Sequence, residues 1–160
     1  MSGEALRVYL TDHLAGSVAA VEFLEHLIKL HRGRDKESFY RELRTEIEED
    51  RSVLQSLLEQ VGGRKSPVRQ AAAWLSEKLG EAKLVFDDPG HDQLRILEAL
   101  ETLALGIQGK SLLWRALASV SDSVPALPAV DLATLERRAG EQFERVDAER
   151  LRIARGALAK

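Results

Sequence analysis

The chain has 160 residues, of which 44% are hydrophobic and 31% charged, and its formal net charge is −3. This length suffices for one domain with its own core, and the mixed charge argues against a nucleic-acid-binding protein, which would carry a basic surplus. The absence of cysteine excludes disulfides, thiolate metal sites and cysteine nucleophiles. No uncharged run could span a membrane and no signal peptide is visible, so we expect a cytoplasmic protein.

Proline and glycine divide the chain into five segments that favour helix, at 5–31, 36–61, 67–80, 92–119 and 130–158. Gly33 and Gly62 stand where the end of a helix favours a left-handed residue. Asp35 is placed to cap the second segment, and Ser66 with Pro67 to begin the third. We therefore predict an all-α protein.

Each long segment carries an apolar seam with alternating spacings of three and four residues, which is typical of helices that pack along their length. The seam residues are Leu10, Leu14, Ser17, Val21, Leu24 and Ile28 in the first segment; Leu43, Ile47, Asp50, Leu54, Leu57 and Val61 in the second; Leu97, Leu100, Ala104, Ile107, Ser111 and Trp114 in the fourth; and Leu132, Leu135, Ala139, Gln142, Val146, Glu149 and Ile153 in the last. These seams predict a common core.

The lengths of the connections predict the topology. Short connections join the first two and the last two long segments, so both pairs should be antiparallel hairpins. The stretch 62–91 is long enough to run back along the bundle, and it contains the short fifth helix, which makes the second and fourth segments parallel. We predict a ferritin-like four-helix bundle with a short helix in the long crossover, folded as a single domain over residues 1–160.

Several polar residues fall on the inner faces of these predicted helices. Asp50 and Gln142 are in register with the core, and Glu46 lies one turn before Asp50. Antiparallel pairing across the first hairpin places Ser17 opposite Asp50 and His13 within one turn of it. We therefore expect His13, Glu46 and Asp50 to converge.

This convergence has two interpretations, because buried charge is costly unless it is paired. Carboxylates and an imidazole suit an iron or manganese site, to which Glu98 and Glu101, on one face of the fourth segment, could add ligands. Alternatively, the residues form a buried polar layer that fixes the helix register, in which Arg138 pairs with Asp50 or Glu98. The members of that layer would be His13, Ser17, Glu46, Asp50, Arg138 and Gln142.

A Gly-Lys-Ser sequence at residues 109–111 is similar to the end of a phosphate-binding loop. Such a loop needs four residues between its two glycines and a place between a strand and a helix, whereas only two residues separate Gly106 from Gly109 in mid-helix. We instead expect these two glycines to let helices approach closely.

Four segments carry a family resemblance: YLTDHLAGS at 9–17, TEIEED at 45–50, WLSEKLGEAKL at 74–84 and LEALETLALGIQGKSLLW at 97–114. On these segments the chain resembles the ferritin-like superfamily and, more narrowly, bacterial four-helix proteins with a DHLAGS start and no assigned activity. Di-iron members of the superfamily carry Glu-x-x-His on two helices. The chain contains no Glu-x-x-His, since its histidines are His13, His26, His31 and His91. The resemblance therefore implies the fold without the usual di-iron centre.

The leading functional hypothesis is a non-catalytic binding or interaction protein without a cofactor. The alternative is a divergent oxidoreductase that binds iron or manganese through His13, Glu46, Asp50 and Glu98 or Glu101, so whether the chain is an enzyme stays open. A third hypothesis is a carrier that holds a small ligand near Gly16 and Gly106. We expect no nucleic-acid or membrane partner; the sequence allows a homodimer and names no other protein partner.

Overall fold

In the computed structural model, four long helices form a bundle: α1 (Ser2–Leu30), α2 (Glu37–Gln60), α4 (Asp92–Ser119) and α5 (Leu132–Leu158). The structure describes residues 2–63, 68–70, 72–73, 77 and 92–159. The described residues of the crossover belong to a short helix, α3, and none of the described residues forms a strand. The prediction of an all-α protein is thus confirmed, while the predicted helix start at Ser66 and Pro67 lies outside the described residues.

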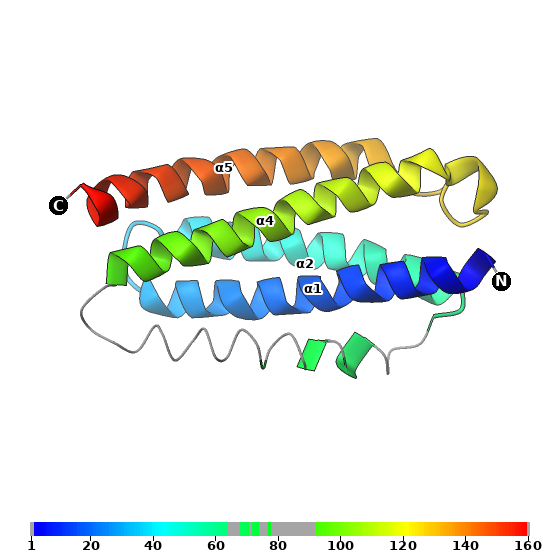
Figure 1. Cartoon of the computed structure of the whole chain (residues 1–160), viewed down its shortest axis with the longest axis horizontal. Helices are drawn as coiled ribbons and strands as arrows, with labels where there is room; N and C mark the ends of the chain where they lie inside the picture. The colour runs from blue at the N-terminus through cyan, green and yellow to red at the C-terminus, as the bar shows by residue number, and fades with distance from the viewer. Residues whose placement is uncertain (1, 64–67, 71, 74–76, 78–91, 160) are drawn as a thin grey trace.

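The helices pack as two antiparallel hairpins, α1 with α2 and α4 with α5 (Figure 1). The chain runs in the same direction in α2 and α4, so the predicted topology of two hairpins joined by a crossover is confirmed. The hairpins stack with α4 against α1. None of the helices in the described part of the chain is long and apolar enough to cross a membrane.

The first hairpin turns on a glycine with a left-handed backbone. Gly33 has φ 73°, and Gly62 at the end of α2 has φ 78°, as predicted for both. The predicted cap at Asp35 is wrong, because α2 begins only at Glu37 and the cap position belongs to Lys36, whose side chain makes no capping hydrogen bond. Instead, the Glu37 carboxylate accepts a hydrogen bond from the Gly33 N–H at 2.7 Å.

The second hairpin turns through a longer connection that contains the 3₁₀ helix η2 (Ser121–Ser123). Leu127 anchors this connection, because its side chain is buried against the ends of α4 and α5. Asp131 then caps α5, where its carboxylate accepts a hydrogen bond from the Thr134 N–H at 3.0 Å.

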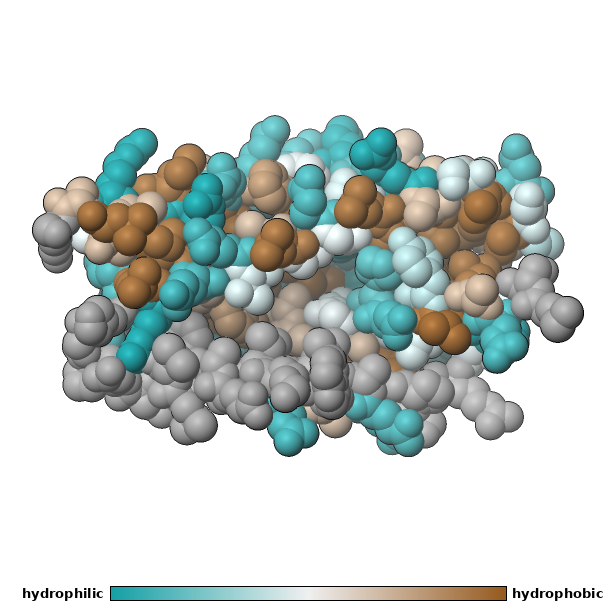
Figure 2. Space-filling model, viewed as in Figure 1, coloured by the Kyte–Doolittle hydropathy of each residue, from teal (hydrophilic) through white to brown (hydrophobic). Residues whose placement is uncertain are grey.

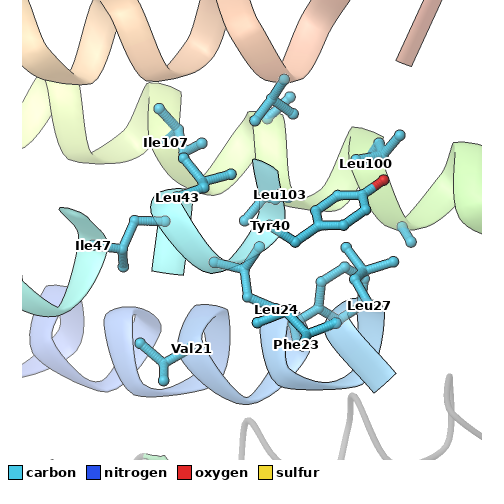
Figure 3. Packing of buried hydrophobic residues seen from close by; sticks show 14 of the residues in the cluster. Val21, Phe23, Leu24, Leu27, Tyr40, Leu43, Ile47, Leu100, Leu103 and Ile107 are labelled. Carbon is cyan, nitrogen blue, oxygen red and sulfur yellow. The ribbon is translucent and has the colours of Figure 1, made fainter. Parts of the chain in front are cut away.

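The apolar core consists of two clusters that follow one another along the bundle. The first lies toward the turn of the α1–α2 hairpin and includes Val21, Leu24, Leu43, Leu100 and Leu103 (Figure 3). The second lies toward the opposite end and includes Leu10, Leu14, Leu57, Leu113, Trp114 and Leu135. The predicted seams therefore do supply the core.

Between the two clusters, each long helix contributes one polar residue. These residues are Ser17 of α1, Asp50 of α2, Lys110 of α4 and Gln142 of α5. In every helix the polar residue lies between the seam residues of one cluster and those of the other. The sequence pattern is therefore interrupted at the same level in all four helices.

Candidate functional site

Asp50, Lys110 and Gln142 form a hydrogen-bonded polar layer at this level. The Lys110 ammonium donates to Asp50 Oδ2 at 2.5 Å and to Gln142 Oε1. The Gln142 amide donates to Glu46 Oε2 at 3.1 Å and to Asp50 Oδ2 at 3.3 Å. Asp50 is 1% exposed and Gln142 is fully buried, so these contacts pair the buried charge of Asp50 at Oδ2, whereas Oδ1 has no hydrogen-bond partner among the described residues.

Two arginines of α5 extend this layer to the surface. Arg138 Nε lies 3.4 Å from Asp50 Oδ1, and its Nη2 donates to the Glu46 carbonyl oxygen at 3.1 Å and to the Glu49 carboxylate. Arg145 Nη2 donates to Glu46 Oε2 at 2.5 Å. Glu46 is consequently engaged by α5 and does not join the residues of α1.

The charges of the polar layer and of the side chains that extend it to the surface balance one another. The three cations Lys110, Arg138 and Arg145 face the carboxylates of Asp50, Glu46 and Glu49. Burial lowers the pKa of Lys110, and the charge of Asp50 opposes this shift. Two N–H groups of the ammonium are used by Asp50 and Gln142, and the third has no hydrogen-bond partner in the described part of the chain.

A cavity of about 440 Å³ adjoins the polar layer between α1, α2 and α4. Figure 2 shows a recess on the face where α4 lies against α1. Its described walls are mostly apolar, and they include Ala19, Ala20, Phe23, Ile47, Leu54, Leu103, Ile107, Leu113 and Trp114. The polar groups at the cavity include Asp50 and Lys110 of the polar layer.

Three helical glycines explain why this space exists. Gly16 of α1 and both Gly106 and Gly109 of α4 line the cavity, and a Cβ atom placed on any of them would meet no described atom within 4 Å. The expectation that Gly106 and Gly109 bring helices into close approach is therefore wrong. They leave space because no described side chain fills the position that a Cβ atom would take.

Further polar residues of α1 also line the cavity. His13 lines it next to Ser17, and burial lowers the pKa of His13 against the opposing charge of Asp12. Trp114 is fully buried, and its indole Nε1 has no hydrogen-bond partner among the described residues. The cavity thus combines an apolar wall with a few hydrogen-bonding groups.

The structure divides the six residues of the expected polar layer between two places. Glu46, Asp50, Arg138 and Gln142 contact one another, with Arg138 beside Asp50 as one interpretation proposed. His13 and Ser17 lie at the cavity, where Ser17 Oγ donates to the carbonyl oxygen of Leu14 in its own helix.

Sequence reasoning missed Lys110, the residue that joins three helices. The seam predicted for its helix, α4, contained Ser111, the residue that follows Lys110. Lys110 lies in a neighbouring seam with the same spacing, formed by Leu103, Ile107, Lys110, Trp114 and Leu117. The buried members on either side of Lys110 in that seam could have identified it.

The residues considered as metal ligands do not come together. Glu98 and Glu101 of α4 are exposed, and Glu101 lies 3.4 Å from Arg150 of α5. Glu46 is engaged by Arg145, whereas His13 and Asp50 line the cavity. Within the described ranges, no group of three or more His, Asp and Glu side chains could hold a metal ion.

Comparisons with protein-family models, with curated proteins and with solved structures give no significant match to this chain. The fold and the site therefore define its class by themselves. It is an all-α protein with four long helices in two hairpins, a buried polar layer and an adjoining apolar cavity.

Proposed function

We propose that this chain is a non-catalytic binding protein that holds a small, mostly apolar molecule in the cavity between α1, α2 and α4. The observation that carries the proposal is the cavity of about 440 Å³ within a bundle whose seams are otherwise buried. Protein interiors are close-packed, and atoms that line an empty space lose the contacts that would stabilise them. A bound apolar molecule would restore those contacts.

The volume sets the size of the ligand. An apolar cavity of about 150 Å³ binds benzene in another protein, and ligand sites commonly measure about 300–1,000 Å³. The cavity of 440 Å³ is therefore large enough for a molecule of two or three rings or an equivalent chain. This agrees with the hypothesis of a carrier that uses the space near Gly16 and Gly106.

The ferritin-like resemblance belongs to the same proposal. The two antiparallel hairpins and the parallel arrangement of α2 and α4 support it. A metal-dependent oxidoreductase finds less support, because the proposed ligands on α1, α2 and α4 lie apart. A cytoplasmic location and a homodimer stay predictions.

Filling the cavity tests the proposed function. The variants Gly16→Leu and Gly106→Leu place a side chain in the open space. We expect the neutral fluorescent probe N-phenyl-1-naphthylamine to bind the unaltered chain saturably, with one site per chain, and each variant to weaken binding at least about tenfold by steric exclusion.

The matched control is Gly140→Leu, because Gly140 also lies within a helix, has open space around its Cβ position and does not line the cavity. This variant should bind the probe as the unaltered chain does. Circular dichroism would show that all three variants stay helical. No saturable binding, or equal binding by all variants, would overturn the proposal.

A further inference from the structure

The following inference rests on the proposed function and concerns the polar end of the ligand. The described residues that line the cavity include one lysine and one arginine, Lys110 of α4 and Arg51 of α2. The Lys110 ammonium is paired with Asp50 and bonded to Gln142. Arg51 forms no ion pair within the described part of the chain, so its positive charge lacks a carboxylate partner.

The spacing along α2 places Arg51 in the wall of the cavity. Ile47, Arg51 and Leu54 are separated by four and three residues, so they share one face of the helix, and all three line the cavity. Ile47 and Leu54 are buried, whereas Arg51 is half-buried and keeps accessible surface. Its flexible stem can pack along the apolar wall while the guanidinium stays within reach of a bound molecule.

The other two arginines of α2 show which partner Arg51 lacks. Arg41 Nη2 lies 2.6 Å from Glu37 Oε1, and Arg44 Nη1 lies 3.7 Å from Glu25 Oε1. A guanidinium binds a carboxylate through two parallel N–H···O hydrogen bonds, which are stronger than bonds between neutral groups. A carboxylate on the ligand would give Arg51 a partner of the same kind.

The remaining charges at the cavity leave Arg51 as the cation that an anionic ligand would meet. Lys110 and Asp50 neutralise one another. Burial lowers the pKa of His13 below its ordinary value of 6.5, so its imidazole is uncharged at pH 7.5. Asp12 is exposed on α1, where water and salt screen its charge more than they screen the half-buried Arg51.

We propose that the ligand is a small monocarboxylate with a mostly apolar body, and that its carboxylate binds the Arg51 guanidinium while the body fills the cavity. The apolar walls of α1, α2 and α4 would contact the body. The carboxylate would fix the orientation of the molecule and keep its own charge at the accessible part of the wall.

Three probes of nearly the same shape separate charge from apolar contact. The planar groups of 2-naphthoate, 2-naphthamide and 2-naphthamidine are negative, neutral and positive, and each molecule has two rings. Using calorimetry on the full chain at pH 7.5, we expect 2-naphthoate to bind at least about tenfold more tightly than 2-naphthamide. We expect 2-naphthamidine to bind most weakly.

The variant Arg51→Met removes the charge and keeps an apolar stem. It should reduce the preference for 2-naphthoate over 2-naphthamide to less than about twofold while 2-naphthamide binds as before. Arg51→Lys keeps the charge without the two parallel N–H groups, and it should retain a preference of at least about threefold.

The matched control is Arg44→Met, because Arg44 is also a half-buried arginine of α2 and does not line the cavity. This control changes the net charge by the same amount and should keep the tenfold preference. Gly106→Leu fills the cavity and should weaken both 2-naphthoate and 2-naphthamide, which places the carboxylate probe in the cavity and not on the outer surface.

The outcomes separate the two proposals. Equal binding of 2-naphthoate and 2-naphthamide, or tightest binding of 2-naphthamidine, would overturn the carboxylate ligand and leave the proposed function standing. A preference for 2-naphthoate that survives Arg51→Met would overturn the assignment to Arg51. Failure of all three probes and of N-phenyl-1-naphthylamine would overturn the proposed function together with this inference.

Discussion

The two hairpins meet along two interfaces that differ in kind. Between α2 and α5, charged side chains bridge the helices, with Lys36 3.1 Å from Glu149 and Arg145 2.5 Å from Glu46. Between α1 and α4, the glycines at positions 16, 106 and 109 leave the cavity. One interface is therefore bridged by long polar side chains, whereas the other contains a cavity.

The difference shows that a regular four-helix frame does not by itself decide where space remains. Arginine and lysine span a gap between helices with their flexible stems, whereas glycine leaves a gap of the same kind unfilled. Lys110 lies at the boundary, since it lines the cavity and bonds to Asp50 of α2 and Gln142 of α5. The polar layer thus separates the interface that contains the cavity from the bridged one.

The largest expected effect on stability comes from breaking the ion pair between Asp50 and Lys110 in the polar layer. Asp50→Ala should lower the free energy of unfolding by about 3–5 kcal/mol, because it leaves the buried Lys110 charge without its carboxylate partner. The double variant Asp50→Ala with Lys110→Met should recover much of that loss. Urea denaturation measures both, and a cost below about 1 kcal/mol for the single variant would show that the pair carries little of the stability.

Alanine in place of a glycine between α1 and α4 should instead raise the free energy of unfolding. Gly106→Ala should raise the free energy of unfolding by about 1 kcal/mol, because alanine favours helix and its methyl group enters open space. Gly62→Ala should lower it by about 1–2 kcal/mol, since φ is 78° there. Thermal denaturation compares the two, and destabilisation by Gly106→Ala would indicate that α4 is closely packed at this point.

The bridged interface should respond only weakly to the loss of one exposed ion pair. In Arg145→Ala the pair with Glu46 is removed, and because its side chains are 37% and 28% exposed, we expect a loss of about 0.2–1 kcal/mol. The loss should shrink as salt is added, because salt screens exposed charges. Denaturation at low and high salt measures it, and a salt-independent loss above 2 kcal/mol would contradict this view.

The smallest effect concerns pH at the cavity. The pKa of His13 in the folded chain is below its ordinary value of 6.5, so the unfolded chain binds more protons below that pH. Its contribution to stability is complete above pH 6.5 and is lost as the pH falls through the folded pKa. His13→Gln should remove this part of the pH dependence in thermal denaturation between pH 7.5 and pH 5.

The carboxylates do not obscure that measurement. Burial alone would raise the pKa of Glu149, but hydrogen bonds from Arg152 and Lys36 outweigh it and lower the pKa below 4.5. The stability that Glu149 contributes is therefore lost at more acidic pH. An unchanged pH profile in the His13 variant would contradict the assignment.

Much of the fold follows from local patterns in the sequence. The seam of α5 predicted which of its residues are buried, including the unusual Gln142 and Glu149, whereas the seam of α1 left out the buried Phe23 and Leu27. The helix ends near Gly33 and Gly62 followed from backbone preference. The predicted cap at Asp35 was wrong, because several polar residues near a helix start compete for one position and the sequence does not decide among them.

The candidate site was predictable only in part. Asp50 and Gln142 stood out because they interrupt apolar seams. Lys110 did not, because α4 carries apolar residues on several faces and its inner seam can be read in more than one register. Glu46 was placed at the right level of the bundle, but its direction toward Arg145 depends on the position of α5.

The sequence by itself determined the four long helices, their hairpin pairing and the level at which polar residues enter the core, because these depend on periodicity, turn residues and connection length. Only the tertiary structure decided that α1 and α4 leave a cavity and that Lys110 joins Asp50 to Gln142. The physical reason is that a seam fixes which residues face inward, whereas the separation of neighbouring helices depends on all the side chains that meet between them.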